Sequence, residues 1–243
     1  MSAADHALYA NHRRFMEAQR GAVTRHEGYD LVHGDIPAFQ VAMLHEARAA
    51  EEAATRAAFV FAPPWAHPGP NAPAFSGLAH QLTHMSLSDE ARRAPTPVEA
   101  LRVEHVADRA RLRTFTEVQA AGFAARPEEH ESLFAWMWDK NRRAVEHADQ
   151  HYYCLRRDGE AVSVLLTVDT GDALGIYAVA TPPARRREGL SSYLLKQVCA
   201  AAPDTAQICL QVMRGSYAEH LYAKLGFAER FVVDVYKSAA RPA

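Results

Sequence analysis

The spacing of apolar positions in the first 95 residues predicts alternating helices and strands. Helices bury one face and repeat their apolar residues every three or four positions, whereas short apolar runs between turn residues are typical of buried strands. By these criteria the chain begins with a helix and then alternates strand, helix, strand, helix and strand. The predicted helices cover Asp5–Gln19, His45–Ala57 and Gly77–Leu82, and the predicted strands cover Tyr29–Val32, Phe59–Phe61 and His84–Leu87.

A second, more regular series of elements runs from Ala100 to the end of the chain. Asp108 is a suitable N-cap for an amphipathic helix, and Arg157-Asp158-Gly159 joins two apolar runs as a hairpin turn. The expected order is β-α-α-β-β-β-α-β-α-β, with antiparallel hairpins in its middle. The predicted strands are Leu101–His105, Tyr152–Arg156, Ala161–Val168, Leu174–Val179, Gln207–Met213 and Phe231–Tyr236, and the predicted helices are Asp108–Gly122, Glu128–His147, Leu190–Ala201 and Tyr217–Leu225.

Two proline-rich stretches interrupt these patterns. Ala62–Pro73 holds five prolines in twelve residues, which excludes a helix or a central strand, and we interpret it as a loop within a domain. Ala94-Pro95-Thr96-Pro97 is the cleaner boundary signal and divides the chain into residues 1–95 and 96–243. The sequence therefore predicts an α/β (α+β) protein with two parts.

Composition and charge exclude several classes of partner and site. The chain has 27 basic and 29 acidic residues, a formal net charge of -2, which argues against a nucleic-acid partner. No apolar run is long enough for a membrane span and no secretory leader is recognisable, so we expect a cytoplasmic protein without a membrane partner. His80 and His84 lack the glutamate that a zinc-hydrolase motif places after the first histidine, so no metal site is expected. Three cysteines without CxxC spacing encode no disulfide framework, and we expect them to serve packing: Cys154, Cys199 and Cys209.

The segment from Val179 to Ser192 has the composition of an anion-binding loop. A predicted strand ends, two prolines follow, and three arginines lead to Gly189, after which a helix begins with two serines in its first turn. A helix N-terminus offers unpaired N–H groups and a partial positive charge, and glycine allows close approach to the backbone. Together these features predict a cradle for a phosphate or pyrophosphate.

This segment and a second one resemble two motifs of the GNAT superfamily of N-acetyltransferases. Val179–Ser192 is similar to motif A, with its (Q/R)-x-x-G-x-(G/A) core on Arg186-Arg187-Glu188-Gly189-Leu190-Ser191, where serine takes the last position. Gly215–Phe227 is similar to motif B, N-x-x-A-x-x-L-Y-x-x-x-G-F, with Gly215 in place of asparagine. The resemblance covers roughly residues 98–240. It implies a GNAT-like fold, a central mixed and mostly antiparallel sheet flanked by helices.

The resemblance also implies a site for acetyl-CoA as cosubstrate. In the family, the strand that precedes the loop, here Ile176–Thr181, splays from its neighbour at a bulge, and its backbone binds pantetheine. Tyr222 takes the position of the general acid that protonates the departing thiolate, a role that suits a phenol. The expected pantetheine residues are Val179 and Thr181, and the expected phosphate-binding residues are Arg186, Arg187, Gly189, Leu190, Ser191 and Ser192.

The function implied is transfer of an acetyl group to a primary amine, of a small molecule or of an exposed amino group, by direct attack. A non-catalytic acyl-CoA-binding module is the alternative, and an aminoacyl-transferase that uses tRNA is disfavoured by the absence of a basic surplus. Residues 1–95 are interpreted as a partial, degenerate GNAT-like lobe without a CoA site, although a separate cap domain would explain them almost as well. The resemblance leaves a homodimer open. A water chain is one candidate for the general base, and the others are Asp169, Asp172, Glu131, His130, His147 and His151.

Overall fold

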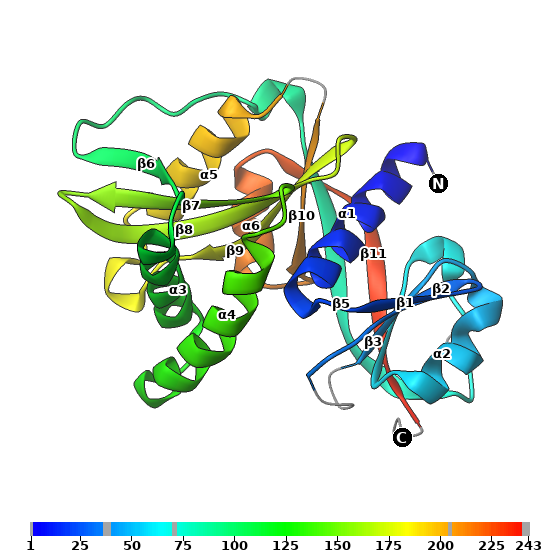
Figure 1. Cartoon of the computed structure of the whole chain (residues 1–243). Coiled ribbons are helices and arrows are strands. Elements are labelled where there is room, and N and C mark those ends of the chain that lie inside the picture. The colour runs from blue at the N-terminus through cyan, green and yellow to red at the C-terminus, as the bar shows by residue number, and fades with distance from the viewer. Residues whose placement is uncertain (1, 36–39, 70–71, 204–205, 240–243) are drawn as a thin grey trace. The chain divides into compact units, whose positions relative to one another are not determined.

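The computed structural model describes residues 2–35, 40–69, 72–203 and 206–239 (Figure 1). The chain forms two compact units, and we treat each by itself. The first unit combines the two ends of the chain, Met1–Ser86 and Leu210–Ala243, and the second unit is Leu87–Cys209. Strand β10 (Gln207–Met213) runs across the second boundary. Within the described ranges, no helix is both long and apolar enough to span a membrane.

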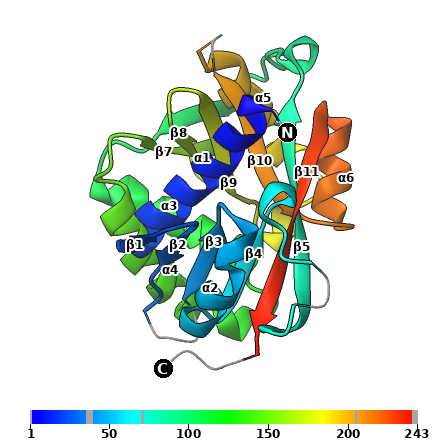
Figure 2. The ribbon, with the colours of Figure 1, turned by 90° about the vertical axis from the view of Figure 1, so that its right-hand side faces the viewer.

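The first unit contains a mixed sheet. Its strands follow the order β1-β2-β3-β4-β11-β5, in which β3 and β4 are parallel and the neighbouring pairs β1-β2, β2-β3 and β4-β11 are antiparallel. Figure 2 shows β11 between β4 and β5. Its elements are α1 (Ala3–Arg20), β1 (Val23–His26), β2 (Tyr29–Val32), β3 (Val41–Leu44), α2 (Ala50–Arg56), β4 (Phe59–Ala62), β5 (Phe75–Leu87, whose last residue belongs to the second unit), α6 (Tyr217–Lys224) and β11 (Phe227–Ser238).

The second unit is an antiparallel sheet with helices on both faces. Its strands follow the order β9-β8-β7-β6. Successive strand residues point to opposite faces: Tyr152 packs edge-on against Phe115 of α3, with ring centroids 4.9 Å apart, whereas Tyr153 lines a cavity with Val198 of α5. Its elements are β6 (Leu101–His105), α3 (Arg109–Phe123), α4 (His130–Ala144), β7 (Gln150–Arg157), β8 (Glu160–Asp169), β9 (Ala173–Ala180) and α5 (Leu190–Ala201).

Most local predictions for the second half of the chain are confirmed. Asp108 caps α3 by accepting a hydrogen bond of 2.8 Å from the N–H of Arg111. Asp158 and Gly159 both have positive φ, as a tight hairpin turn between β7 and β8 requires. The α/β class with a largely antiparallel sheet flanked by helices is as expected.

The predictions for the first half contain one error and two omissions. The predicted helix over Gly77–Leu82 is wrong, because these residues lie within the long strand β5 and Ser76 beside them bonds to β11 carbonyl groups. His80 and His84 therefore lie on a strand, and no group of metal ligands occurs among the described residues. Strands β1 and β3 were not predicted. The proline-rich stretch Ala62–Pro73 is a loop where it is described; residues 70 and 71 lie outside the described residues.

A histidine is buried among aromatic rings in the first unit. His84 is fully buried, stacks on Phe231 at 4.5 Å between ring centroids, and lies 5.3 Å from the ring of His12. Neither ring nitrogen of His84 has a hydrogen-bond partner among the described residues. Burial lowers the pKa of His84 well below its usual range, with the neighbouring His12 adding to the effect, and burial also lowers the pKa of His12 to about 4.

These lowered pKa values predict that acid destabilises the protein. In the unfolded chain both histidines take up protons near pH 6.5, whereas the folded protein resists protonation, so the free energy of unfolding falls as the pH decreases from 6.5 toward 4. His84→Phe keeps the stacking on Phe231 and removes two unpaired buried nitrogens. We expect it to stabilise the protein by about 1–3 kcal/mol and to reduce the acid slope. Urea denaturation at pH 7.5 and 5.0 measures both effects; an unchanged slope would contradict the assignment.

Candidate functional site

Strand β9 has a bulge just before the predicted phosphate loop. Val164 of β8 lies opposite Ala180 and Leu166 lies opposite Tyr177, so that Ala178 and Val179 together face the single intervening residue of β8. Ala178 has φ of +53°, a left-handed conformation that a non-glycine residue seldom adopts. A bulge breaks the regular pairing and turns backbone groups away from the ladder. The bulge expected between Ile176 and Thr181 is therefore present.

The chain leaves β9 through a turn that side chains hold in place. The hydroxyl of Ser163 donates to the carbonyl of Ala180 at 3.0 Å, and its oxygen lies 2.9 Å from Oγ1 of Thr181. A serine has one hydroxyl proton, so Thr181 donates to Ser163. The guanidinium of Arg186 donates to the carbonyl of Gly122 at 2.8 Å and to that of Thr181 at 3.4 Å. Thr181 and Arg186 thus fix the loop, and their roles in ligand binding stay predictions.

Helix α3 approaches this turn very closely at Gly122. A Cβ atom on Gly122 would lie 2.8 Å from Cβ of Ala180 and 3.1 Å from the backbone nitrogen of Thr181. Ser163 and Gly122 were not singled out from the sequence, because a serine inside a strand and a glycine near the end of a helix carry no local mark of these contacts. Two ion pairs also hold the loop, Arg185 with Glu160 and Arg157 with Glu188.

The N-terminus of α5 presents free backbone donors. Gly189 caps the helix with φ of +75°, and Arg187 before it has φ of +67°. In the described part of the chain, the N–H groups of Leu190, Ser191 and Ser192 donate to no acceptor, as expected for the first turn of a helix. Gly189 is exposed, and the space beside its Cα is open. The first turn of α5 can therefore accept an anionic group.

Tyr222 belongs to α6 of the first unit. It is half-buried and packs edge-on against Phe227, with ring centroids 5.9 Å apart. Burial raises the pKa of Tyr222 to about 12, so its phenol is protonated at neutral pH. Ser216 caps α6 by accepting from the N–H of Glu219, and the Glu219 carboxylate accepts from the N–H of Gly215 at 2.6 Å.

The candidates for the general base divide into two groups by their place in the second unit. Asp169 pairs with Leu174 at the start of β9. His151 pairs with Thr167, two residues before Asp169 on β8. At about 3.3 Å per residue, this end of β9 is on the order of 15 Å from Val179, which is too far for a direct proton transfer at the bulge. His147 and Asp172 lie at the same distant end. His130 and Glu131 lie in the first turn of α4, where Nε2 of His130 is 3.4 Å from the carbonyl of Glu117 in α3.

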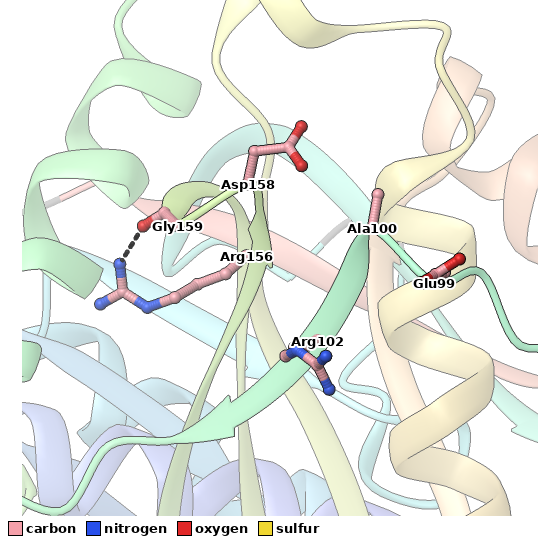
Figure 3. A pocket seen from close by; sticks show the side chains of 6 residues that line it. All are labelled: Glu99, Ala100, Arg102, Arg156, Asp158 and Gly159. Carbon is pink, nitrogen blue, oxygen red and sulfur yellow. Dashed lines mark hydrogen bonds between the residues drawn. The ribbon is translucent and has the colours of Figure 1, made fainter.

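Several cavities of the second unit lie outside the loop. Figure 3 shows one of about 630 Å³ at the β7–β8 turn and the start of β6; it contains none of the predicted site residues, and Arg156 in its wall donates to the carbonyl of Gly159 at 2.8 Å. Another, of about 390 Å³, includes His151 and Asp169 and lies beside the last turn of α5, at the end of that helix opposite Gly189.

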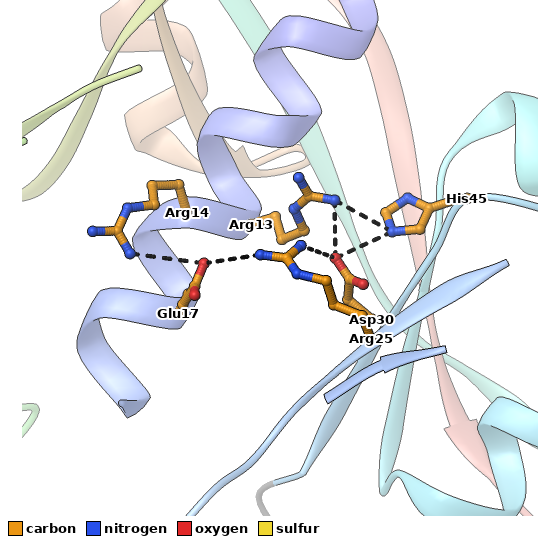
Figure 4. A network of polar contacts seen from close by, with 6 residues as sticks. All are labelled: Arg13, Arg14, Glu17, Arg25, Asp30 and His45. Carbon is orange, nitrogen blue, oxygen red and sulfur yellow. Dashed lines mark hydrogen bonds and ion pairs between the residues drawn. The ribbon is translucent and has the colours of Figure 1, made fainter. Parts of the chain in front are cut away.

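Charged and polar side chains of the first unit form a network in which they pair with one another (Figure 4). The side chain of Asp30 is nearly buried and accepts from Arg13 at 2.9 Å, while Nε2 of His45 lies 3.3 Å from the same oxygen and Arg25 lies at 3.5 Å. Burial acts to raise the pKa of Asp30, but the hydrogen bond with His45 and the two arginines outweigh it and lower the pKa. The network ties α1 to strands β1, β2 and the end of β3.

The three cysteines are unpaired and buried. Burial raises the pKa of Cys154, Cys199 and Cys209 to about 12, so each remains a thiol at neutral pH. They are therefore unsuited to nucleophilic catalysis, in agreement with the packing role expected from the sequence.

Residues 105–227 match the family model of the acetyltransferase (GNAT) family. The chain belongs to this family. Its fold is similar to that of a GCN5-related N-acetyltransferase from Kribbella flavida, with a TM-score of 0.68, 12% identity, and coverage of 99% of this chain and 97% of that one. No curated protein sequence matches the chain.

Two further solved structures share the fold. One is named as a putative acetyltransferase of the GNAT family from Novosphingobium aromaticivorans, with a TM-score of 0.58, 15% identity, and coverage of 91% of this chain and 93% of that one. The other is a tandem GNAT protein from the clavulanic acid biosynthesis pathway, with a TM-score of 0.57, 15% identity, and coverage of 88% and 79%. At these identities the likeness concerns the fold.

The close contact at Gly122 leads to a stability prediction. Gly122→Ala would gain up to about 1 kcal/mol in helix propensity, but its Cβ would press on Ala180 and on the backbone of Thr181. Because overpacking of this kind costs about 1–3 kcal/mol, we expect net destabilisation, measured by urea denaturation. A variant more stable than the wild type would show that α3 can move away from β9 at no cost.

Proposed function

We propose that this chain is an acetyl-CoA-dependent N-acetyltransferase that acts in the cytoplasm on a primary amine of a small molecule or an exposed amino group. The observation that supports this most is the succession of a bulged strand, an anchored turn and three free N–H groups at the start of α5. In this proposal the backbone amides of Leu190, Ser191 and Ser192 hold the pyrophosphate. Arg187 and Gly189 shape the backbone that leads to these amides. Val179 and Thr181 bind the pantetheine arm.

The chemistry we propose is direct transfer. The amine nitrogen attacks the thioester carbonyl, whose developing negative charge is stabilised by a backbone N–H near Val179. The C–N bond forms, the C–S bond breaks, and the Tyr222 phenol gives its proton to the leaving sulfur and regains one from solvent. The proton released by the amine goes to a base or to water, and His130 and Glu131 in the first turn of α4 are the side-chain candidates. The high pKa values of the three cysteines argue against a covalent acyl-enzyme through a cysteine.

The cradle is tested with a pair of substitutions at Gly189. Asparagine tolerates the left-handed backbone better than most residues and has the size of aspartate, so Gly189→Asn controls for backbone strain and bulk. Gly189→Asp adds a negative charge where the phosphates are expected. CoA should raise the melting temperature of the wild type and of Gly189→Asn, and its affinity for Gly189→Asp should fall at least about 10-fold, equivalent to about 1.4 kcal/mol. Equal CoA-induced shifts of the melting temperature in all three proteins would show that CoA binds elsewhere.

Tyr222→Phe separates an enzyme from a binding module. The substitution keeps the ring and its packing on Phe227 but removes the phenolic proton. We expect the affinity for acetyl-CoA to stay unchanged and kcat to fall about 10²–10³-fold, with the best amine from a panel that is screened by thiol release. Tyr217→Phe is the control, because Tyr217 lies on the same helix with 79% of its surface exposed. Equal kcat values would reduce Tyr222 to a packing residue, and CoA binding without any accepted amine would favour the non-catalytic alternative.

A further inference from the structure

Strand β6 has one unpaired edge. It pairs with β7 on one side, and no described strand pairs with its other side; Figure 1 shows it as the outermost strand of the second unit. The N–H of Val106 donates to the carbonyl of Tyr152 at 2.9 Å. This hydrogen bond shows which residues of β6 direct their backbone groups toward β7. By the alternation of an antiparallel ladder, Leu101, Val103 and His105 direct their backbone groups away from β7. An open edge of this kind is a template for a further strand.

The five residues of β6 are complementary to themselves in the antiparallel direction. When two copies of Leu101–His105 pair about a twofold axis at Val103, Arg102 of each copy lies opposite Glu104 of the other. The two pairs are equivalent by symmetry, as an isologous interface requires. Arg102 and Glu104 then form non-hydrogen-bonded pairs, in which Cα atoms approach to about 4.5 Å and side chains interact most strongly.

The directions of the backbone N–H and C=O groups of β6 agree with this register. In such a pair the two Val103 residues would face each other with outward N–H and C=O groups and exchange two hydrogen bonds. The N–H of each His105 would meet the carbonyl of Leu101 in the other copy, which would add two more. The N–H of Leu101 already donates to the carbonyl of Val98 at 2.9 Å, so it takes no part. Four backbone hydrogen bonds would therefore join the two strands, and a shift by one residue would lose them.

The charges within one chain favour the same partner. The exposed Arg102 has no acidic partner among the described residues, and its cross-strand neighbour on β7 is Arg156, a like charge. Glu104 accepts from Arg156 at 2.6 Å and from Arg111 at 2.9 Å, and a carboxylate can accept more than two hydrogen bonds. The partner's carboxylate would supply the counter-charge that Arg102 lacks. Val103 and Val98 are 37% and 46% exposed, and pairing would cover apolar surface at the edge.

We propose that two copies of this chain associate through their β6 strands, antiparallel and centred on Val103. The partner is a second copy of the chain because the sequence of β6 complements its own reverse. A five-residue strand pair covers less surface than a standard protein interface, so the dimer should be weak and form at concentrations on the order of micromolar or above. The proposal concerns the second unit alone and does not depend on the proposed catalytic activity.

Sedimentation of the full chain over a range from about 1 to 200 µM tests the proposal. The wild-type mass should rise from 26.9 kDa toward twice that value. Arg102→Glu places a carboxylate opposite Glu104 of the partner at both equivalent positions, while within the chain it faces Arg156 and keeps the fold. We expect it to weaken association at least 10-fold. Arg93→Glu, at an exposed position before the strand, makes the same charge change as a control and should dimerise like the wild type.

A second variant tests the backbone hydrogen bonds. Val103→Pro removes an N–H that points away from β7, so it takes no hydrogen bond from the β6–β7 pair, and proline is tolerated on edge strands. It should be monomeric throughout the range and retain the wild-type circular dichroism spectrum. A wild-type protein that stays monomeric at the highest concentration would overturn the proposal. Dimerisation of Arg102→Glu and Val103→Pro at wild-type strength would also overturn it, because the interface would then lie elsewhere.

Discussion

The close approach of α3 to the end of β9 sets the geometry of the candidate site. Gly122 has no side chain, so the backbone of Thr181 can lie against the helix, and the freed carbonyl of Gly122 accepts from Arg186. This one contact positions the turn from which α5 begins. It also uses the guanidinium of Arg186 for internal support, whereas the backbone N–H groups of the α5 first turn remain available as donors for an anion. A helix N-terminus provides such donors at no further cost in side-chain ordering.

The sequence predicts the second unit well because its information is local. Helix α5 and strand β10 have the predicted bounds, and the Asp158-Gly159 turn takes the expected conformation. Each of these features depends on residues within a few positions of one another, such as a glycine cap or an apolar repeat. The anchoring contacts of the site are different in kind. Arg186 and Gly122 are 64 residues apart, and nothing in either segment marks the other.

The first unit shows what local patterns cannot predict. Its sheet joins β4 to β11, so that Phe61 lies opposite Val235, far away in sequence. The structure accordingly divides the chain at Ser86 and Leu210, whereas the sequence places its boundary at the prolines near residue 95. The same long-range pairing explains the strand over Gly77–Leu82, where β11 provides hydrogen-bond partners that outweigh a weak helical pattern. That the first 95 residues are a degenerate GNAT-like lobe stays a prediction.

Backbone conformation explains why the departures from the two family motifs are conservative. Gly215 replaces asparagine at a position with φ of +74°, and glycine and asparagine are the residues that adopt this left-handed conformation most readily. Its N–H remains bonded to the Glu219 carboxylate, which in turn accepts from Thr83, so the start of α6 keeps its polar support. Ser191 replaces a smaller residue but lies half-buried in the first turn of α5 with its N–H unpaired. Both substitutions leave unchanged what the backbone offers, which is a left-handed turn in one case and a free donor in the other.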